Sequence, residues 1–302
     1  MEVLHSLHIK DRFKKNSSLK EEPISQDGDD NKDNKQKTSK IPETQKEHIR
    51  EYIKIGITGF DELLEKGIPK GSSILLCGGA GTGKTLFGLQ TLNYGAENGE
   101  KCLYMSFEES EERLKEHMRD FNADPEKLEK DGRLIIQRLK PYEISKSVEA
   151  LLMKAEGELL IDIKPVILPK DFKPDRIVID SLTAIASAFA GDEKTYRVYI
   201  EQLFLFLEST GATSFLITET DQIPRGLLTK SGVEEFLADG VIILYHIRKG
   251  DIREHAIEIL KLRGANHSKR IVAVQISGKT GLIVYPQQKV FGGLGSEEGK
   301  LS

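Results

Sequence analysis

Short apolar runs alternate with longer segments of helical periodicity through the middle of the chain. The runs are rich in aliphatic and aromatic residues and bounded by Gly, Pro and charged residues, as in buried strands: SILLCG (73–78), CLYMSF (102–107), LIIQRL (134–139), RIVID (176–180) and TSFLITET (213–220). Helices are expected after Lys84, after Ser110, around Val148–Leu159 and over Tyr196–Leu207. This alternation predicts an α/β fold, with a mainly parallel central sheet and helices on both faces.

The pattern changes between residues 241 and 285. Four apolar runs follow one another with only short polar turns between them: VIILYHI, HAIEILKL, RIVAVQI and GLIVY. Short turns join antiparallel strands, whereas parallel strands need longer crossovers. We therefore expect C-terminal β-hairpins added to the edge of the sheet.

The segment EILKLRGANHSK (258–269) ends one of these runs. If it is extended, side chains alternate between faces. Ile257, Ile259, Lys261 and Arg263 would then share one face, so that an apolar row ends in two cations. A carboxylate, a nucleic acid and a nucleotide phosphate are all candidate partners for these charges.

The two ends of the 302-residue chain differ in composition from its centre. Between Lys14 and His48 charges of both signs alternate with Asn, Gln and Ser, and such a segment buries too little apolar surface to offset its ordering entropy. We expect a disordered charged tail over residues 1–50, one domain over 51–286, and a flexible tail over 287–302. The first tail is either a solvated leader without function or a docking or regulatory tail.

Composition narrows the class of protein. A net charge of −4 gives no general attraction to nucleic acid. Cys77 and Cys102 lie inside apolar runs, which indicates buried thiols in a reducing compartment. No run approaches the roughly 18 apolar residues of a membrane span. We expect a cytoplasmic protein without a membrane partner.

The strongest chemical signal is GGAGTGKT, which fits G-x-x-x-x-G-K-[ST] between a predicted strand and a predicted helix. Glycines let backbone N–H groups approach phosphate oxygens, and the following helix N-terminus favours negative charge. Lys84 is expected to reach the β and γ phosphates, and the Thr85 hydroxyl to ligate Mg²⁺. The predicted nucleotide-binding residues are Gly78, Gly79, Ala80, Gly81, Thr82, Gly83, Lys84 and Thr85.

Two other strand ends carry carboxylates. Asp180 ends RIVID at the edge where parallel sheets bind ligands, and is expected to hold the metal through water. Glu108 and Glu109 end the strand CLYMSF. Either they orient and deprotonate the water that attacks the γ-phosphate, or they are first-turn acids of a helix opened by Ser106 or Ser110.

These motifs together resemble the KaiC family of RecA-like ATPases, and most of all the N-terminal ATPase half of its two-domain members. The resemblance spans roughly residues 54–286. It rests on TGFD (58–61) and GIP (67–69) ahead of the phosphate loop, on SFEES and DSLTAI, and on the segments SGVEEFLADGVIIL and EILKLRGANHSK. The fold implied is a RecA-like P-loop NTPase core.

The resemblance also implies function. It assigns Glu108 and Glu109 to water activation, and implies an ATP- and Mg²⁺-dependent hydrolase whose sites lie between subunits of a homo-oligomeric, hexameric ring. By position, Lys261 and Arg263 would contact the γ-phosphate of the neighbouring subunit as catalytic cations. The segment would contribute nucleotide-binding residues to that neighbour: Lys261, Leu262, Arg263, His267 and Lys269.

Several alternatives remain open at this point. Glu235 and Phe236 stand where the autokinase half of the family has a Ser-Thr pair, which favours a plain ATPase over autophosphorylation. A RecA-like recombinase or helicase would need DNA contacts, for which only Arg225 and Lys230 in the loop DQIPRGLLTKSG are candidates. A nucleotide-gated scaffold without hydrolysis is a further reading. A regulatory protein partner is expected but not specified, and no circadian role follows.

Overall fold

The computed structural model describes residues 50–154, 168–189, 191–220, 228–229 and 232–290. Predictions for the charged N-terminal tail, for the helix end at 155–159, for Arg225 and Lys230, and for the residues from 291 onward fall outside this part of the chain. Residues 287–289, predicted to lie in the C-terminal tail, belong instead to the last strand. In the described part, no helix combines the length and the apolar character needed to cross a bilayer.

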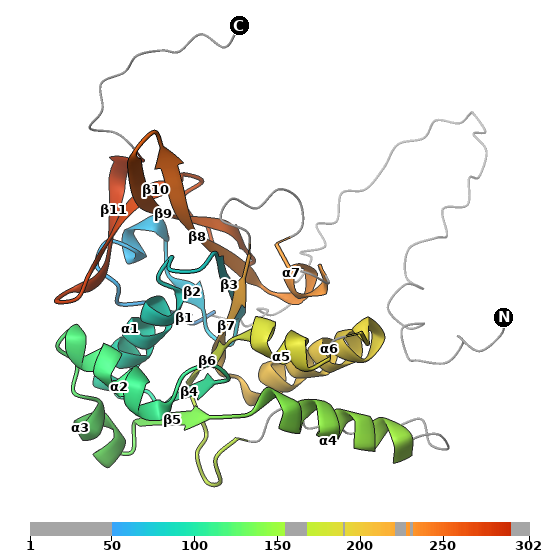
Figure 1. Cartoon of the computed structure of the whole chain (residues 1–302). Helices are drawn as coiled ribbons and strands as arrows, with labels where there is room; N and C mark the ends of the chain where they lie inside the picture. The colour runs from blue at the N-terminus through green and yellow to red at the C-terminus, as the bar shows by residue number, and fades with distance from the viewer. Residues whose placement is uncertain (1–49, 155–167, 190, 221–227, 230–231, 291–302) are drawn as a thin grey trace, which may run out of the picture. The chain divides into compact units, whose positions relative to one another are not determined.

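A nine-stranded sheet in the order β11-β10-β9-β8-β3-β7-β6-β4-β5 organises the described residues (Figure 1). The predicted strands appear as β3 (Ser73–Gly78), β4 (Cys102–Ser106), β5 (Leu134–Arg138), β6 (Arg176–Asp180) and β7 (Thr213–Glu219). These strands pair in parallel, which confirms the α/β prediction. The sheet brings the carboxyl ends of β3, β4 and β6 to one edge, where parallel sheets bind ligands.

The C-terminal runs extend the same sheet. They form β8 (Gly240–Lys249), β9 (Ile252–Leu262), β10 (Val272–Ser277) and β11 (Gly281–Lys289). β8 is parallel to β3, and the strands after it are antiparallel to their neighbours. The predicted hairpins are confirmed, and β8 is the strand that joins them to the parallel part.

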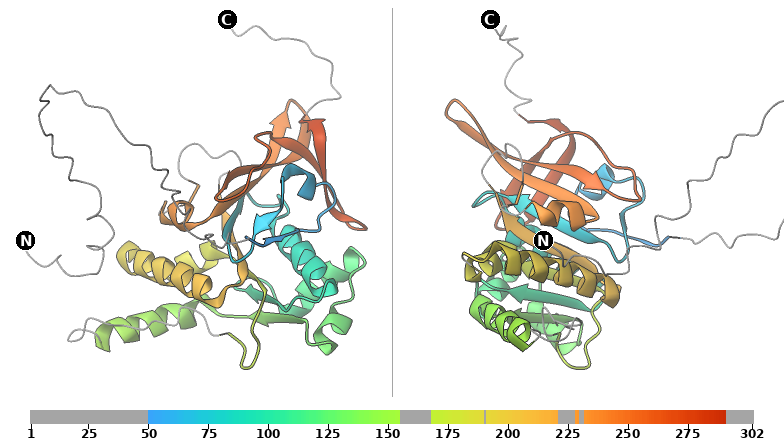
Figure 2. Two further views of the ribbon diagram at one scale, coloured as in Figure 1. Left: turned by 180° about the vertical axis from the view of Figure 1, so that it is seen from behind. Right: turned by 90° about the vertical axis from the view of Figure 1, so that its right-hand side faces the viewer.

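Helices cover both faces of the sheet, as two views at right angles show (Figure 2). One face is covered by α1 (Lys84–Glu97), α2 (Glu111–Asp120) and α3 (Pro125–Lys130), and the other by α4 (Pro141–Lys154), α5 (Leu182–Ala188) and α6 (Glu193–Thr210). Alternation along each strand produces the two cores. Tyr104 packs with the first group of helices, whereas Leu103 and Met105 pack with the second.

Three small elements precede the sheet along the chain. The strands β1 (Tyr52–Ile53) and β2 (Ile68–Pro69) pair antiparallel, and a 3₁₀ turn, η1 (Asp61–Leu63), lies between them. The Asp61 carboxylate accepts the backbone N–H groups of Ile55 (2.8 Å) and Gly56 (2.9 Å). The aspartate of the TGFD motif therefore closes a turn ahead of the phosphate loop.

Helix boundaries differ from expectation where capping residues decide them. α4 begins at Pro141, well before the expected Val148, because proline suits the first helical position. Three short helices were not expected: α3, α5 and α7 (Val233–Leu237). Asp124 and Ser181 cap the first two through their side chains, and these capping residues were readable signals.

The prediction that Lys261 lies on the same face of its strand as Ile259 is wrong. A register shift in the β8–β9 pairing sets Ile259 opposite Ile242 and Lys261 opposite Val241, and Leu260 is left 52% exposed between them. Ile242 and Val241 belong to the cores on opposite sides of the sheet. The β-bulge thus turns Lys261 away from the face of Ile259 and toward α7.

Candidate functional site

The phosphate loop lies between β3 and α1. Gly81 (φ 74°) and Gly83 (φ 95°) adopt left-handed backbone conformations that cost side-chain-bearing residues energy, and Gly83 is the N-cap of α1. The Thr82 hydroxyl donates to the carbonyl of Gly79 (2.9 Å). The loop has the tight backbone that phosphate binding requires.

Lys84 is 8% exposed, and its Nζ donates to the carbonyl oxygen of Gly79 at 2.8 Å. Burial lowers the pKa of Lys84, and the carboxylates of Glu219, Asp180 and Glu108 oppose that shift. A buried ammonium gains strongly from a nearby anion, because little solvent screens the interaction. Lys84 is therefore suited to a phosphate oxygen.

Asp180, at the end of the RIVID strand, is hydrogen-bonded to Thr85 of the phosphate loop. The Thr85 hydroxyl donates to Asp180 Oδ2 (2.9 Å), and the buried Tyr104 hydroxyl donates to the same oxygen (2.6 Å). Burial raises the pKa of Asp180, and these two hydrogen bonds counteract the shift. Burial and the Asp180 charge raise the pKa of Tyr104, so its hydroxyl keeps the donated proton. The peptide bond between Asp180 and Ser181 is cis.

Glu108 and Glu109 have separate surroundings. The Glu108 carboxylate accepts the hydroxyl hydrogen of Ser181, the residue after Asp180. Glu109 Oε2 lies 3.1 Å from Arg113 Nε and 3.1 Å from His117 Nε2, both on α2. One carboxylate is held beside the end of β6, whereas the other is held by the helix that follows.

The predicted helix cap is present at Ser110, but Glu108 and Glu109 precede α2 and are not its first-turn acids. Ser110 is the N-cap of α2 and accepts the backbone N–H of Arg113 at 3.4 Å. The Ser106 hydroxyl accepts the N–H of Glu109 at 2.9 Å and that of Glu108 at 3.3 Å. The glutamates thus sit on a turn whose backbone is fixed from both sides.

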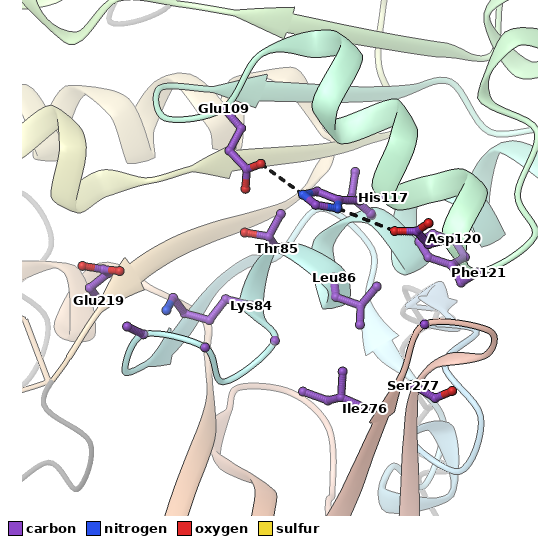
Figure 3. Close-up of a pocket in the computed structure, with 15 residues that line it drawn as sticks. Lys84, Thr85, Leu86, Glu109, His117, Asp120, Phe121, Glu219, Ile276 and Ser277 are labelled. Carbon is purple, nitrogen blue, oxygen red and sulfur yellow. Dashed lines mark hydrogen bonds and ion pairs between the residues drawn. The ribbon is translucent and has the colours of Figure 1, made fainter.

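A cavity of about 400 Å³ extends from the phosphate loop to α2 and the β10–β11 turn (Figure 3). Lys84, Thr85 and Glu219 lie at one end. At the other end His117 lies between Glu109 and Asp120, above Ile276 and Ser277. The first end offers the positive charge of Lys84 to phosphate groups. The second end offers apolar and polar side chains that could contact the rest of a nucleotide.

Lys261 and Arg263 contact α7 instead of this cavity. Lys261 Nζ donates to the carbonyls of Glu235 (3.0 Å) and Ala238 (2.6 Å), and burial together with the Arg263 charge lowers the pKa of Lys261. The Arg263 guanidinium donates to the carbonyl of Phe236 (3.0 Å). In the described single chain, the cations meet the carbonyls at the end of a helix.

The remaining residues of the predicted segment lie near β9. Leu262 packs against the core on the α1 side, and His267 forms an isolated antiparallel bridge with Leu64. Lys269 Nζ is 3.0 Å from His267 Nε2. None of these residues, nor Lys261 or Arg263, is among the described residues that line the cavity.

Sequence reasoning missed several residues of the site, among them Tyr104, Ser181 and His117. Tyr104 had a readable signal, because a tyrosine within a fully buried strand needs a partner for its hydroxyl. Ser181 had one as well, since it follows Asp180 and opens α5. His117 had none, because its proximity to Glu109 depends on how α2 packs.

The parallel sheet, the loop between β3 and α1, and the joined Thr85 and Asp180 define a RecA-like P-loop fold. A family model described as the KaiC ATPase matches residues 53–289. The chain belongs to the KaiC family.

Similar proteins agree with this assignment. The circadian clock protein KaiC3 of Synechocystis sp. is 32% identical over 236 residues, which is 78% of this chain and 46% of that protein. The circadian clock oscillator protein KaiC of Synechococcus elongatus is 34% identical over 214 residues, or 70% and 40%. The chain thus spans less than half the length of these relatives.

A solved structure covers the same region. The crystal structure of a KaiC-like protein from Pyrococcus horikoshii OT3 superposes with a TM-score of 0.65 at 33% identity, over 78% of this chain and 100% of that one. The chain therefore carries a single KaiC-like domain.

Proposed function

We propose that this protein is a Mg²⁺-dependent ATP hydrolase that acts as a nucleotide-driven, ring-forming switch in the cytoplasm. The observation that carries the proposal is the 2.9 Å hydrogen bond between Thr85 and Asp180. It joins the two motifs that hold the metal in P-loop enzymes, 95 residues apart in the chain.

The donor chemistry fits Mg²⁺, which prefers oxygen ligands and is commonly held by one or two carboxylates together with substrate phosphates. Thr85 would be a direct ligand, and Asp180 would hold the ion through water. Among the described residues no three His, Cys, Asp or Glu converge as a metal cage, in keeping with an ion that arrives with its nucleotide. When bound, the ion neutralises developing charge on the phosphates.

The chain's own groups would supply the remaining chemistry. Glu108, held by Ser181, accepts a proton from the attacking water as general base. Lys84 stabilises negative charge on the transferred phosphoryl group. Glu109 would help to position the loop that carries Glu108, because Arg113 and His117 hold the Glu109 carboxylate on α2.

The proposed ring shares each site between two subunits. It is supported by the positions of Lys261, Arg263, His267 and Lys269, which do not line the cavity of their own chain. In a head-to-tail ring, such cations complete the site of the next copy. Each site would then be incomplete in a monomer. The hexamer is the ring that the sequence resemblance implies.

The test combines phosphate release with mass measurement. The chain is expected to release phosphate from ATP with Mg²⁺ but not with EDTA, and to form larger oligomers with ATP. Lys84→Ala should abolish ATP binding, because the phosphates lose their principal cation. A chain that stays monomeric at all ATP concentrations would contradict the shared sites, and Mg²⁺-independent turnover would contradict the metal.

A further inference from the structure

Tyr104 lies in β4 with its ring buried in the core on the α1 side of the sheet, and the residue is fully buried. A Cβ placed on Gly88 of α1 would come within 3.5 Å of the ring atom Cε2. Complete burial of the residue thus holds the ring in place independently of its hydroxyl. The hydroxyl is a donor at a fixed position.

That hydroxyl and the Thr85 hydroxyl meet at one atom. Both donate to Asp180 Oδ2, Tyr104 at 2.6 Å and Thr85 at 2.9 Å. A hydroxyl that donates its hydrogen keeps two lone pairs, so Thr85 can donate to Asp180 and still ligate a metal. Oδ1 takes neither of these hydrogen bonds and is the oxygen available to a metal-bound water.

We propose that Tyr104 is a positioning residue for the metal carboxylate of Asp180, holding Oδ2 so that Oδ1 is presented beside Thr85. The inference rests on the proposed Mg²⁺ dependence. Thr85 alone would restrain the carboxylate with a side chain that must also serve the ion, whereas Tyr104 is not one of the proposed metal ligands. Removing its hydroxyl should weaken metal binding more than nucleotide binding.

Tyr104→Phe tests this in the full chain, because it removes one oxygen and keeps the ring. The readout is the affinity for a fluorescent ATP analogue, measured in EDTA and across a Mg²⁺ titration. We expect the Mg²⁺ concentration for half-maximal effect to rise about tenfold, as for other partners of metal ligands, with the affinity in EDTA unchanged. Tyr199→Phe removes another fully buried tyrosine hydroxyl, on the opposite face of the sheet, and should match the parent.

The outcomes separate the two proposals. If Mg²⁺ has no effect on the parent, the proposed metal dependence fails and the role of Tyr104 fails with it. If the parent responds and Tyr104→Phe has the same Mg²⁺ requirement, only the role of Tyr104 is overturned. Equal losses with and without Mg²⁺ would also overturn it, because they indicate a purely structural role. Tyr104→Met provides the same comparison if the phenylalanine variant does not fold.

Discussion

Lys261 Nζ lies 2.6 Å from the carbonyl oxygen of Ala238, just after the last residue of α7. Helix ends leave carbonyls without intrahelical partners, and a cation there is favourable. Glu235 ties the start of the same helix to the chain before it, because its carboxylate accepts the backbone N–H of Thr229 at 2.7 Å. The position of α7 therefore sets where the two cations of the segment are presented.

Subunit mixing tests whether these cations act on a neighbour. Lys84→Ala and Arg263→Ala chains should each be nearly inactive, since every site lacks one half. In an equal mixture about a quarter of the sites in a head-to-tail ring pair two intact halves, so about that fraction of parent activity should return. Phosphate release measures it.

The matched control mixes Lys84→Ala with Thr85→Ala chains, in which both changes affect the same half of a site. This mixture should stay inactive, because every site lacks one of the two phosphate-loop side chains. Equal recovery in both mixtures would indicate revertant or contaminating activity and would contradict the shared site.

The two glutamates should differ in their effect on hydrolysis. Glu108→Gln is expected to slow phosphate release by on the order of 10²–10⁴, the usual contribution of a general base. Glu109→Gln should cost much less, because Glu109 is held by Arg113 and His117. Single-turnover phosphate release with bound Mg²⁺–ATP makes the comparison, and a larger loss in Glu109→Gln would reverse the assigned roles.

Arg176 should be the most sensitive charged residue for stability. It is fully buried, and its guanidinium donates to both carboxylate oxygens of Glu100 (2.7 Å each) and to the Thr91 carbonyl (3.0 Å). Arg176→Ala should cost about 3–5 kcal/mol in urea unfolding, because the buried hydrogen-bonding groups lose their partner.

An exposed arginine provides the control. Arg197 on α6 pairs with Glu201, and their side chains are 64% and 47% exposed. Arg197→Ala should change the unfolding free energy by less than about 1 kcal/mol, as is usual for surface ion pairs. Similar losses in the two variants would show that burial does not set the cost at Arg176.

The thiols should be unreactive in the folded protein. Burial raises the pKa of Cys102 to about 12 and also raises the pKa of Cys77. Because these folded-state values are raised, the associated stability is present below the unfolded pKa of about 8.5 and is lost as pH rises toward the folded values. Alkylation at pH 8 should be slow in buffer and fast in urea, and rapid native labelling would contradict the burial.

The local sequence pattern was enough to predict those parts of the structure that depend on residues close together in the chain. The phosphate loop was predictable because Gly81 and Gly83 occur at fixed spacing before Lys84. The strands were predictable because buried parallel strands are nearly continuous apolar runs. Capping residues such as Ser110 were predictable for the same reason, since they bond to backbone groups three residues away.

Lys261 shows why pattern fails at longer range. Strict alternation predicted that Lys261 lies on the same face of the strand as Ile259, but the β-bulge at Leu260 places it on the opposite face. A bulge depends on how β9 pairs with the neighbouring strand β8, and the sequence pattern of β9 does not contain that information. The paired glutamates are a similar case. Their separate partners, Ser181 and His117, come from other elements, so their adjacency in the sequence did not indicate that their roles differ.

The sequence by itself determined the α/β class, the phosphate loop and the carboxylate at the end of β6, because each rests on local backbone geometry and on the burial of contiguous apolar residues. Only the tertiary structure decided which hydroxyls reach Asp180 and which helix end holds Lys261. Those contacts join residues far apart in the chain, and a hydrogen bond forms only where packing brings donor and acceptor within about 3 Å.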